Sequence, residues 1–245
     1  MLSNRIKPRF IIFDYGETLA HEDGFYPNLG FAALLEYAVN NPHGMDGNTL
    51  LDAFAACFKQ LRLNAHAAGA EIPNRHRWKW LFEMFDLEFS LPEDELETTF
   101  WNAAAPCVPT PGMVVLLSIL REQGIGTGVV SNMGFTGTAL KRRLEGLFPE
   151  HNFQFIMSSA DYVLRKPNPH LFELAIKKSG CPADEIWFAG DNPAMDIVGA
   201  ANAGLTPVYY DRDLGCSYRE TPHVDVMPSC IRIADWSELY AFLKT

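Results

Sequence analysis

Asp14 is the residue from which a hydrolytic reaction can start. It directly follows the apolar run Phe10–Phe13, and a run that is apolar on both faces is typical of a central parallel strand. A carboxylate at the end of such a strand can attack phosphorus and form an aspartyl-phosphate when a cation neutralises the attacked group. Because an isolated aspartate at a strand end is more often a turn residue, other segments must decide the interpretation.

Two further carboxylates complement Asp14. Asp191 follows another apolar run, residues 186–189, and Asp196 lies five residues later, in the first turn of an expected helix. Asp196 taken alone is explained by the favourable position of a negative charge at a helix start. Together the three carboxylates make a site of hard oxygen ligands, the kind that Mg²⁺ prefers.

Lys166, Ser131 and Asn132 supply positive charge and hydrogen-bond donors for phosphoryl oxygens. Ser131 and Asn132 follow the apolar run 125–130, and Lys166 lies in a loop before an expected helix. Phosphoryl transfer depends mainly on positioning and charge stabilisation, which this set provides. A loop serine and an exposed lysine are each ordinary when taken alone, so the argument rests on their occurrence together in separate segments.

The elements that must position these residues alternate along the chain. Strand-like runs cover residues 10–13, 125–130, 153–157, 186–189, 207–210 and, more weakly, 231–233. Helices between them are marked by a capping residue, a proline and a later glycine, at Thr110-Pro111 to Gly124, Asn168-Pro169 to Gly180 and Asn192-Pro193 to Gly204. This alternation predicts an α/β fold with a Rossmann-like, doubly wound parallel sheet, whose ligands bind outside the carboxyl ends of the strands.

The segment from about Phe25 to Pro106 has a different pattern. It has several helix-period patterns and no convincing strand, and the expected helices cover residues 29–39, 50–66, 75–85 and 93–104. We therefore expect a core of residues 1–22 and 108–245 interrupted by an all-helical insert, residues 23–107, with hinges near 20–25 and 106–111. A cleft between two such parts is a common place for a ligand.

Composition narrows the class of protein. The 245 residues carry a formal net charge of -10, which argues against a nucleic-acid-binding protein with a clustered basic face. No apolar run is long enough to span a bilayer, so no membrane partner is expected. The five cysteines are scattered and form no CxxC motif, which indicates reduced thiols and a cytoplasmic protein. The sequence leaves both a monomer and a homodimer open.

Four motifs in order resemble those of the haloacid dehalogenase (HAD) superfamily, in the branch with a helical C1-type cap after the first strand (subfamily I). They are Phe13–Leu19, Val130–Asn132, Lys166–Pro169 and Gly190-Asp191 followed by Asp196. The resemblance implies hydrolysis of a small phosphorylated substrate through an aspartyl-phosphate on Asp14. It also implies Mg²⁺ held by Asp14, the backbone carbonyl of Gly16 and Asp191, with Asp196 assisting the metal site or positioning Lys166.

Gly16 departs from the superfamily's pattern, in which phosphatases usually carry an aspartate as general acid and base two positions after the nucleophile. General acid–base catalysis contributes about 10²–10⁴-fold, so another group is needed, and the candidates are Glu17, His21 and His76. One alternative is a 2-haloacid dehalogenase, which attacks carbon without a metal and carries a tyrosine at the position of Gly16. It leaves the acidic cluster unexplained. The other alternative is a non-catalytic member that binds a ligand or partner.

Overall fold

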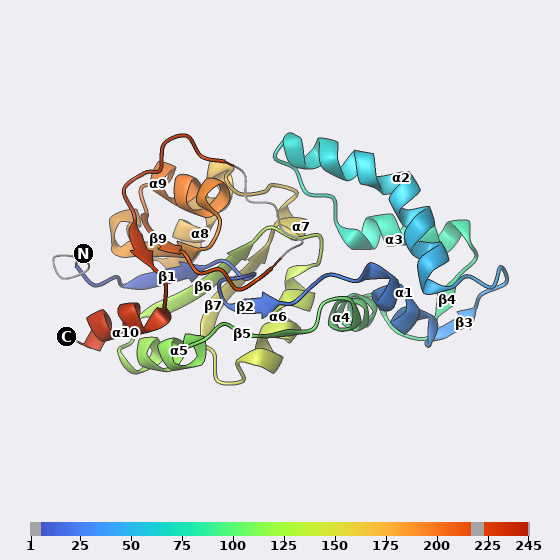
Figure 1. Ribbon diagram of the computed structural model, residues 1–245, viewed down its shortest axis with the longest axis horizontal. Coiled ribbons are helices and arrows are strands. Elements are labelled where there is room, and N and C mark those ends of the chain that lie inside the picture. Colours follow the sequence, from blue (N-terminus) through green and yellow to red (C-terminus); the bar gives the residue numbers. More distant parts are fainter. Residues whose placement is uncertain (1–5, 217–222, 245) are drawn as a thin grey trace.

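A six-stranded parallel sheet forms the core of the computed structural model, which describes residues 6–216 and 223–244 (Figure 1). The strand order is β10-β9-β8-β1-β6-β7, with β1 paired to β6 on one side and to β8 on the other. The bounds are β1 Phe10–Phe13, β6 Gly126–Ser131, β7 Phe153–Ser158, β8 Ile186–Gly190, β9 Thr206–Tyr210 and β10 Ile231–Ile233. All six predicted strands are confirmed, and the polar residues that follow β1, β6 and β8 meet at one edge of the sheet.

Helices cover both faces of the sheet, as the prediction of a doubly wound fold requires. Successive side chains of a strand point to opposite faces. Ile11 and Phe13 accordingly pack in a cluster with α5 (Met113–Glu122), α6 (Gly137–Leu147) and α10 (Trp236–Lys244). The alternate residues Phe10 and Ile12 pack in a second cluster with α8 (Pro169–Ser179) and α9 (Val198–Asn202). The apolar runs are thus continuous because β1 is buried on both faces.

Two of the three predicted helix starts are confirmed. Asn168 caps α8, which ends at the left-handed Gly180, and Asn192 caps a π-helical turn, Pro193–Ile197, that leads into α9. The start predicted at Thr110-Pro111 is wrong, because α5 begins only after Gly112, whose φ is 87°. Thr110 Oγ1 instead donates a hydrogen bond to the carbonyl of Thr18 (2.6 Å) and is thereby used outside the helix. A short helix, α7 (Ser159–Tyr162), follows β7.

The insert is built from four helices and one small two-stranded sheet. The helices are α1 (Pro27–Leu35), α2 (Gly47–Ala67), α3 (Asn74–Met84) and α4 (Glu93–Ala104). The prediction of an all-helical insert is wrong, because β3 (Ala38–Asn40) pairs antiparallel with β4 (Glu88–Phe89). Strands this short show no alternating pattern, and Val39, assigned to a helix, is 65% exposed on β3. Aromatic rings form the centre of the insert, where Phe100 contacts Phe31 and Trp78 with centroid distances of 5.0 and 4.7 Å.

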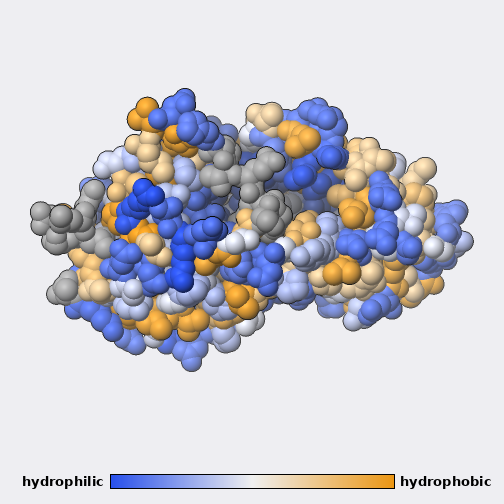
Figure 2. All heavy atoms as spheres, in the orientation of Figure 1, coloured by the Kyte–Doolittle hydropathy of each residue, from blue (hydrophilic) through white to orange (hydrophobic). Residues whose placement is uncertain are grey.

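The two chain segments that connect the core to the insert pair with each other. β2 (Ala20–Glu22) and β5 (Cys107–Pro109) form an antiparallel ribbon in which His21 lies opposite Val108. The ribbon falls within both predicted hinge regions, while the domain boundaries themselves stay a prediction. On the face shown in Figure 2 a hollow bordered by hydrophilic residues separates the core from the α2–α3 end of the insert. In the parts of the chain that the structure describes, no helix combines the length and apolar character that crossing a membrane requires.

Candidate active site

Lys166 forms the centre of a buried ion cluster. Its Nζ lies 2.7 Å from Asp14 Oδ1 and 2.6 Å from Asp196 Oδ1, and the lysine is only 3% exposed. Burial alone would lower the pKa of Lys166, but the two carboxylates outweigh it and raise that pKa. The ammonium is therefore charged at neutral pH, and the pairing compensates the cost of burying it.

Asp191 completes a group of three carboxylates. Oxygen atoms of Asp14, Asp191 and Asp196 all lie within 4.8 Å of one another. Thr18 Oγ1 donates to Asp191 Oδ1 (3.3 Å). Three negative charges against one ammonium leave an excess that a divalent cation would balance, and carboxylate oxygens are suitable ligands for Mg²⁺. The side chains that the structure brings together therefore fit the predicted magnesium site.

Asp196 is held in place by the strand end before it. Its Oδ2 accepts a hydrogen bond from the backbone N–H of Asn192 (3.0 Å). A Cβ at Gly190 would lie 2.4 Å from Asp196 Cγ, so the close approach requires glycine at this strand end. Burial raises the pKa of Asp196 to about 6, against the opposing effect of the Lys166 ammonium. Loss of the lysine charge would thus make protonation of Asp196 easier still.

Asn132 contacts Lys166 rather than standing free. Its Nδ2 donates to the Lys166 carbonyl (2.9 Å), and its Oδ1 accepts from the Lys166 N–H (2.8 Å). The amide thus fixes the backbone that carries the ammonium, a contact that sequence reasoning did not predict. Ser131 is buried at the end of β6, beside β1. Direct contacts of Ser131 and Asn132 with a phosphoryl group stay a prediction.

The chain turns tightly after the predicted nucleophile. Gly16 forms an isolated bridge with Ala20, and Glu17 has a left-handed φ of 56° and donates its N–H to the Ala20 carbonyl (2.7 Å). This turn brings residues 16–20 back beside the strand end. The predicted role of the Gly16 carbonyl as a metal ligand stays a prediction.

The three candidates for the missing acid–base group lie in different places. Glu17 is buried, and its Oε2 lies 2.8 Å from His21 Nδ1. Burial would lower the pKa of His21, but its hydrogen bond to Glu17 and that carboxylate's charge outweigh it and raise the pKa. His76 is exposed on α3. Glu17 and His21 are thus paired beside the site, while His76 is not part of that pair.

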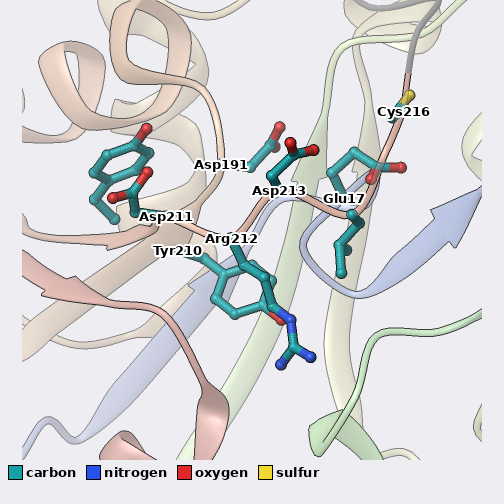
Figure 3. Close-up of a pocket in the computed structure, with 9 residues that line it drawn as sticks. Glu17, Asp191, Tyr210, Asp211, Arg212, Asp213 and Cys216 are labelled. Atoms are coloured by element: carbon teal, nitrogen blue, oxygen red, sulfur yellow. The ribbon is translucent and has the colours of Figure 1, made fainter.

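A pocket of about 220 Å³ opens beside Asp191 and Glu17 (Figure 3). Its other lining residues come from the end of β9 and the segment after it: Tyr209, Tyr210, Asp211, Arg212, Asp213, Leu214 and Cys216. Sequence reasoning did not include this segment in the site. The signal was available, because Asp211 directly follows a predicted strand just as Asp14 does, and polar residues at the carboxyl ends of parallel strands share one edge.

Comparisons with known proteins agree with this geometry. A model of the haloacid dehalogenase-like hydrolase family matches residues 8–204. Pyrimidine 5'-nucleotidase YjjG of Escherichia coli (strain K12) is 32% identical over 144 residues, 58% of this chain and 60% of that protein. A phosphoserine phosphatase of Thermus thermophilus is 29% identical over 171 residues, 69% of this chain and 66% of that protein. The chain therefore spans less than two thirds of the length of these relatives.

A solved structure shows the same fold. HAD-hydrolase YfnB of Bacillus subtilis, bound to magnesium, superimposes with a TM-score of 0.59 at 21% sequence identity, over 98% of this chain and 100% of that one.

Proposed function

This chain belongs to the haloacid dehalogenase-like hydrolase family, and we propose that within that family it is a magnesium-dependent phosphatase acting on small phosphomonoesters through Asp14. The observation that carries the proposal is the buried cluster in which Lys166 contacts both Asp14 and Asp196 beside Asp191. A strand-end carboxylate, a paired ammonium and spare acidic ligands are what phosphoryl transfer needs in one place.

In the proposed reaction Asp14 attacks the phosphorus of the substrate. A bond from an Asp14 oxygen to phosphorus forms as the bond to the alcohol oxygen breaks, and the alcohol takes up a proton as it leaves. Water then attacks the phosphorus of the aspartyl-phosphate, which releases inorganic phosphate and restores the carboxylate. This route divides one difficult displacement into two easier ones.

Each polar residue has a distinct part in this proposal. Asp14, the Gly16 carbonyl and Asp191 would hold Mg²⁺, which when bound would neutralise negative charge on the phosphoryl group. Lys166 adds a second positive charge and orients Asp14, to which its Nζ donates a hydrogen bond. Asp196 accepts a second hydrogen bond from this Nζ and so fixes the lysine. Ser131 and Asn132 donate to the phosphoryl oxygens.

Glu17, supported by His21, is the group that we assign to proton transfer in place of the absent aspartate. Glu17 lines the same pocket as Asp191, and His21 is hydrogen-bonded to it at 2.8 Å. The exposed position of His76 on α3 makes it the weaker candidate. Replacing Glu17 with Gln should lower kcat by about 10²–10⁴-fold and change the pH–rate profile, whereas an unchanged rate and profile would exclude Glu17.

The insert supports a role as a cap over the substrate, and the relatives support the substrate class. The names of the nucleotidase and the phosphoserine phosphatase describe small phosphorylated substrates. The three clustered carboxylates favour a phosphatase over a 2-haloacid dehalogenase, which needs no metal. We place the protein in the cytoplasm, as a monomer or homodimer that requires neither nucleic acid nor membrane.

The test is phosphate release from a panel of phosphomonoesters, with Mg²⁺ or with a chelator, by the wild type and Asp14→Asn. Asp184→Asn is the matched control, because Asp184 is an exposed residue of the short 3-10 helix before the start of β8, whereas the site lies after the end of that strand. Release that requires both Mg²⁺ and Asp14 but tolerates Asp184→Asn is the expected result. No release from any substrate would overturn the proposal and favour a non-catalytic binding protein.

A further inference from the structure

The loop between α2 and α3, residues 68–73, docks on the core immediately before Lys166. We call it the docking loop; it faces the short helix α7 and the segment after it (Figure 1). Its backbone contacts are Glu71 N–H to the Val163 carbonyl (2.5 Å), Arg165 N–H to the Gly69 carbonyl (3.0 Å) and a bridge between Ala70 and Leu164. The docking loop therefore pairs with the three residues that precede the lysine of the proposed site.

Glu71 carries the side-chain part of this contact. Its carboxylate is almost completely buried and contacts the Arg165 guanidinium. It also accepts from Ser159 Oγ (3.1 Å) and lies 3.2 Å from His66 Nε2. Burial would raise the pKa of Glu71, but His66 and Arg165 outweigh it and lower that pKa. The carboxylate is thus charged, and it depends on partners that belong partly to the insert and partly to the core.

The contacts of Glu71 reach both sides of the Asn132–Lys166 pair. Arg165 directly precedes Lys166. Ser159, the other core partner, accepts a hydrogen bond from the Met133 N–H (2.9 Å), and Met133 directly follows Asn132. Glu71 therefore contacts the segment before Lys166 directly, and the segment after Asn132 through Ser159; Asn132 joins these two segments through its bonds to the Lys166 N–H and carbonyl.

We propose that Glu71 is a positioning residue that couples docking of the insert to placement of Lys166 against Asp14. The proposal rests on the proposed function, in which Lys166 orients the nucleophile. With Glu71 docked, the segment 163–166 is fixed from the insert side and the loop after β6 is fixed through Ser159. With the loop undocked, Lys166 keeps its core contacts with Asn132, Asp14 and Asp196 and loses the support from the insert side.

Steady-state kinetics of Glu71→Gln and Arg165→Gln give the first test. Each variant should lower kcat by about 10- to 100-fold, the range in which a misplacement of about 1 Å falls, while KM stays within about threefold. Glu83→Gln is the matched control, because Glu83 is an exposed residue of α3 that forms a surface ion pair with Lys79. It should keep wild-type rates.

The double variant Glu71→Gln/Arg165→Gln guards against loss of folding, because it leaves no isolated charge of this pair in the interface. Its kcat should be no lower than that of the poorer single variant, since one contact is lost in all three proteins. Effects of the two substitutions that multiply independently would overturn the coupling.

Amide-resolved hydrogen exchange separates positioning from simple docking. The Lys166 N–H is bonded within the core, to Asn132. We expect it to exchange about tenfold faster in Glu71→Gln than in Glu83→Gln, as for a hydrogen bond opened locally. Faster exchange confined to the Glu71 and Arg165 amides would show docking without positioning and overturn the proposal. This measurement needs no turnover. If the protein released no phosphate, the proposed function would fail, but hydrogen exchange would still decide the role of Glu71.

Discussion

Two of the contacts between the insert and the core are built differently. At the connecting ribbon, the buried Glu22 carboxylate accepts from Tyr15 Oη (3.1 Å), Trp101 Nε1 (3.2 Å) and Arg143 Nη2 (3.2 Å); we call these four residues the hinge network. At the docking loop, the Glu71 carboxylate is equally buried, but the side chains of its partners Arg165 and His66 remain 17% and 25% exposed.

This difference indicates that the two contacts serve different purposes. In the hinge network every charge is removed from water, and Arg143 also lies over the Trp101 ring at 4.3 Å. Removing one partner from such a cluster leaves the others in a medium of low polarity. In the docking loop, water reaches Arg165 and His66, so separation costs less. The hinge network is suited to a contact that stays closed, and the docking loop to a contact that opens and closes.

The largest expected effect comes from breaking the hinge network. Arg143→Met removes the guanidinium charge beside the buried Glu22 carboxylate and should lower the free energy of unfolding by about 3–5 kcal/mol. Arg142→Met is the matched control on the same helix, because Arg142 pairs with Asp94 at the surface and such pairs contribute about 0–1 kcal/mol. Urea unfolding of both proteins measures the difference; equal losses would contradict the distinction between buried and exposed pairs.

A smaller loss of stability is expected from a substitution that crowds the contact between α3 of the insert and the loop after β6. The Asn74 N–H donates to the Gly134 carbonyl (2.7 Å), and a Cβ at Gly134 would lie 2.7 Å from Asn74 Oδ1 and 3.0 Å from Arg77 Nη2. Both side chains are buried, so Gly134→Ala should cost about 1–3 kcal/mol of stability.

Gly146→Ala provides the opposite control. Nothing lies within 4 Å of its added Cβ on α6, so it should stabilise by about 0.4–1 kcal/mol. Thermal unfolding would show the two signs, and a neutral Gly134→Ala would mean that the insert moves aside without cost.

The smallest expected effect is a pH dependence of stability that arises from Glu71 in the docking loop. The pKa of Glu71 is lower in the folded protein than the value of about 4.3 expected in the unfolded chain. The contribution of Glu71 to stability is therefore fully present above about pH 4.3 and is lost as the pH falls through the folded pKa. The difference in unfolding free energy between wild type and Glu71→Gln should be constant from neutral pH down to about 5 and then shrink. A difference independent of pH would contradict the charged state of Glu71.

How far the sequence predicts this molecule depends on whether a feature is local. The strands β1, β6 and β8 were predictable because burial on both faces produces continuous apolar runs. The ribbon and the two-stranded sheet of the insert were not, because strands of two or three residues have no period and form only where tertiary contacts bring them together. Strand ends and glycine-marked helices are local signals, whereas these pairings are not.

The same distinction applies to the candidate site. Asp14 and Asp191 could be placed together because both follow strands whose ends share one edge of the sheet. Glu71 could not be found, since it is one acidic residue in a short loop and Arg165 lies 94 positions away. The use of the Asn132 amide on the Lys166 backbone likewise depends on a contact between segments 34 residues apart, which no local pattern encodes.

The ribbon of β2 and β5 also limits the directions in which the insert can travel. Sliding one strand along the other would break the ladder at Ala20–Pro109, His21–Val108 and Glu22–Cys107, whereas bending the ribbon across its face preserves it. The ribbon therefore lets the insert rotate by bending but opposes its translation along the strands. A small rotation of the insert keeps α4, which lies beside the ribbon, in contact with α6. The same rotation separates the docking loop from the core (Figure 1).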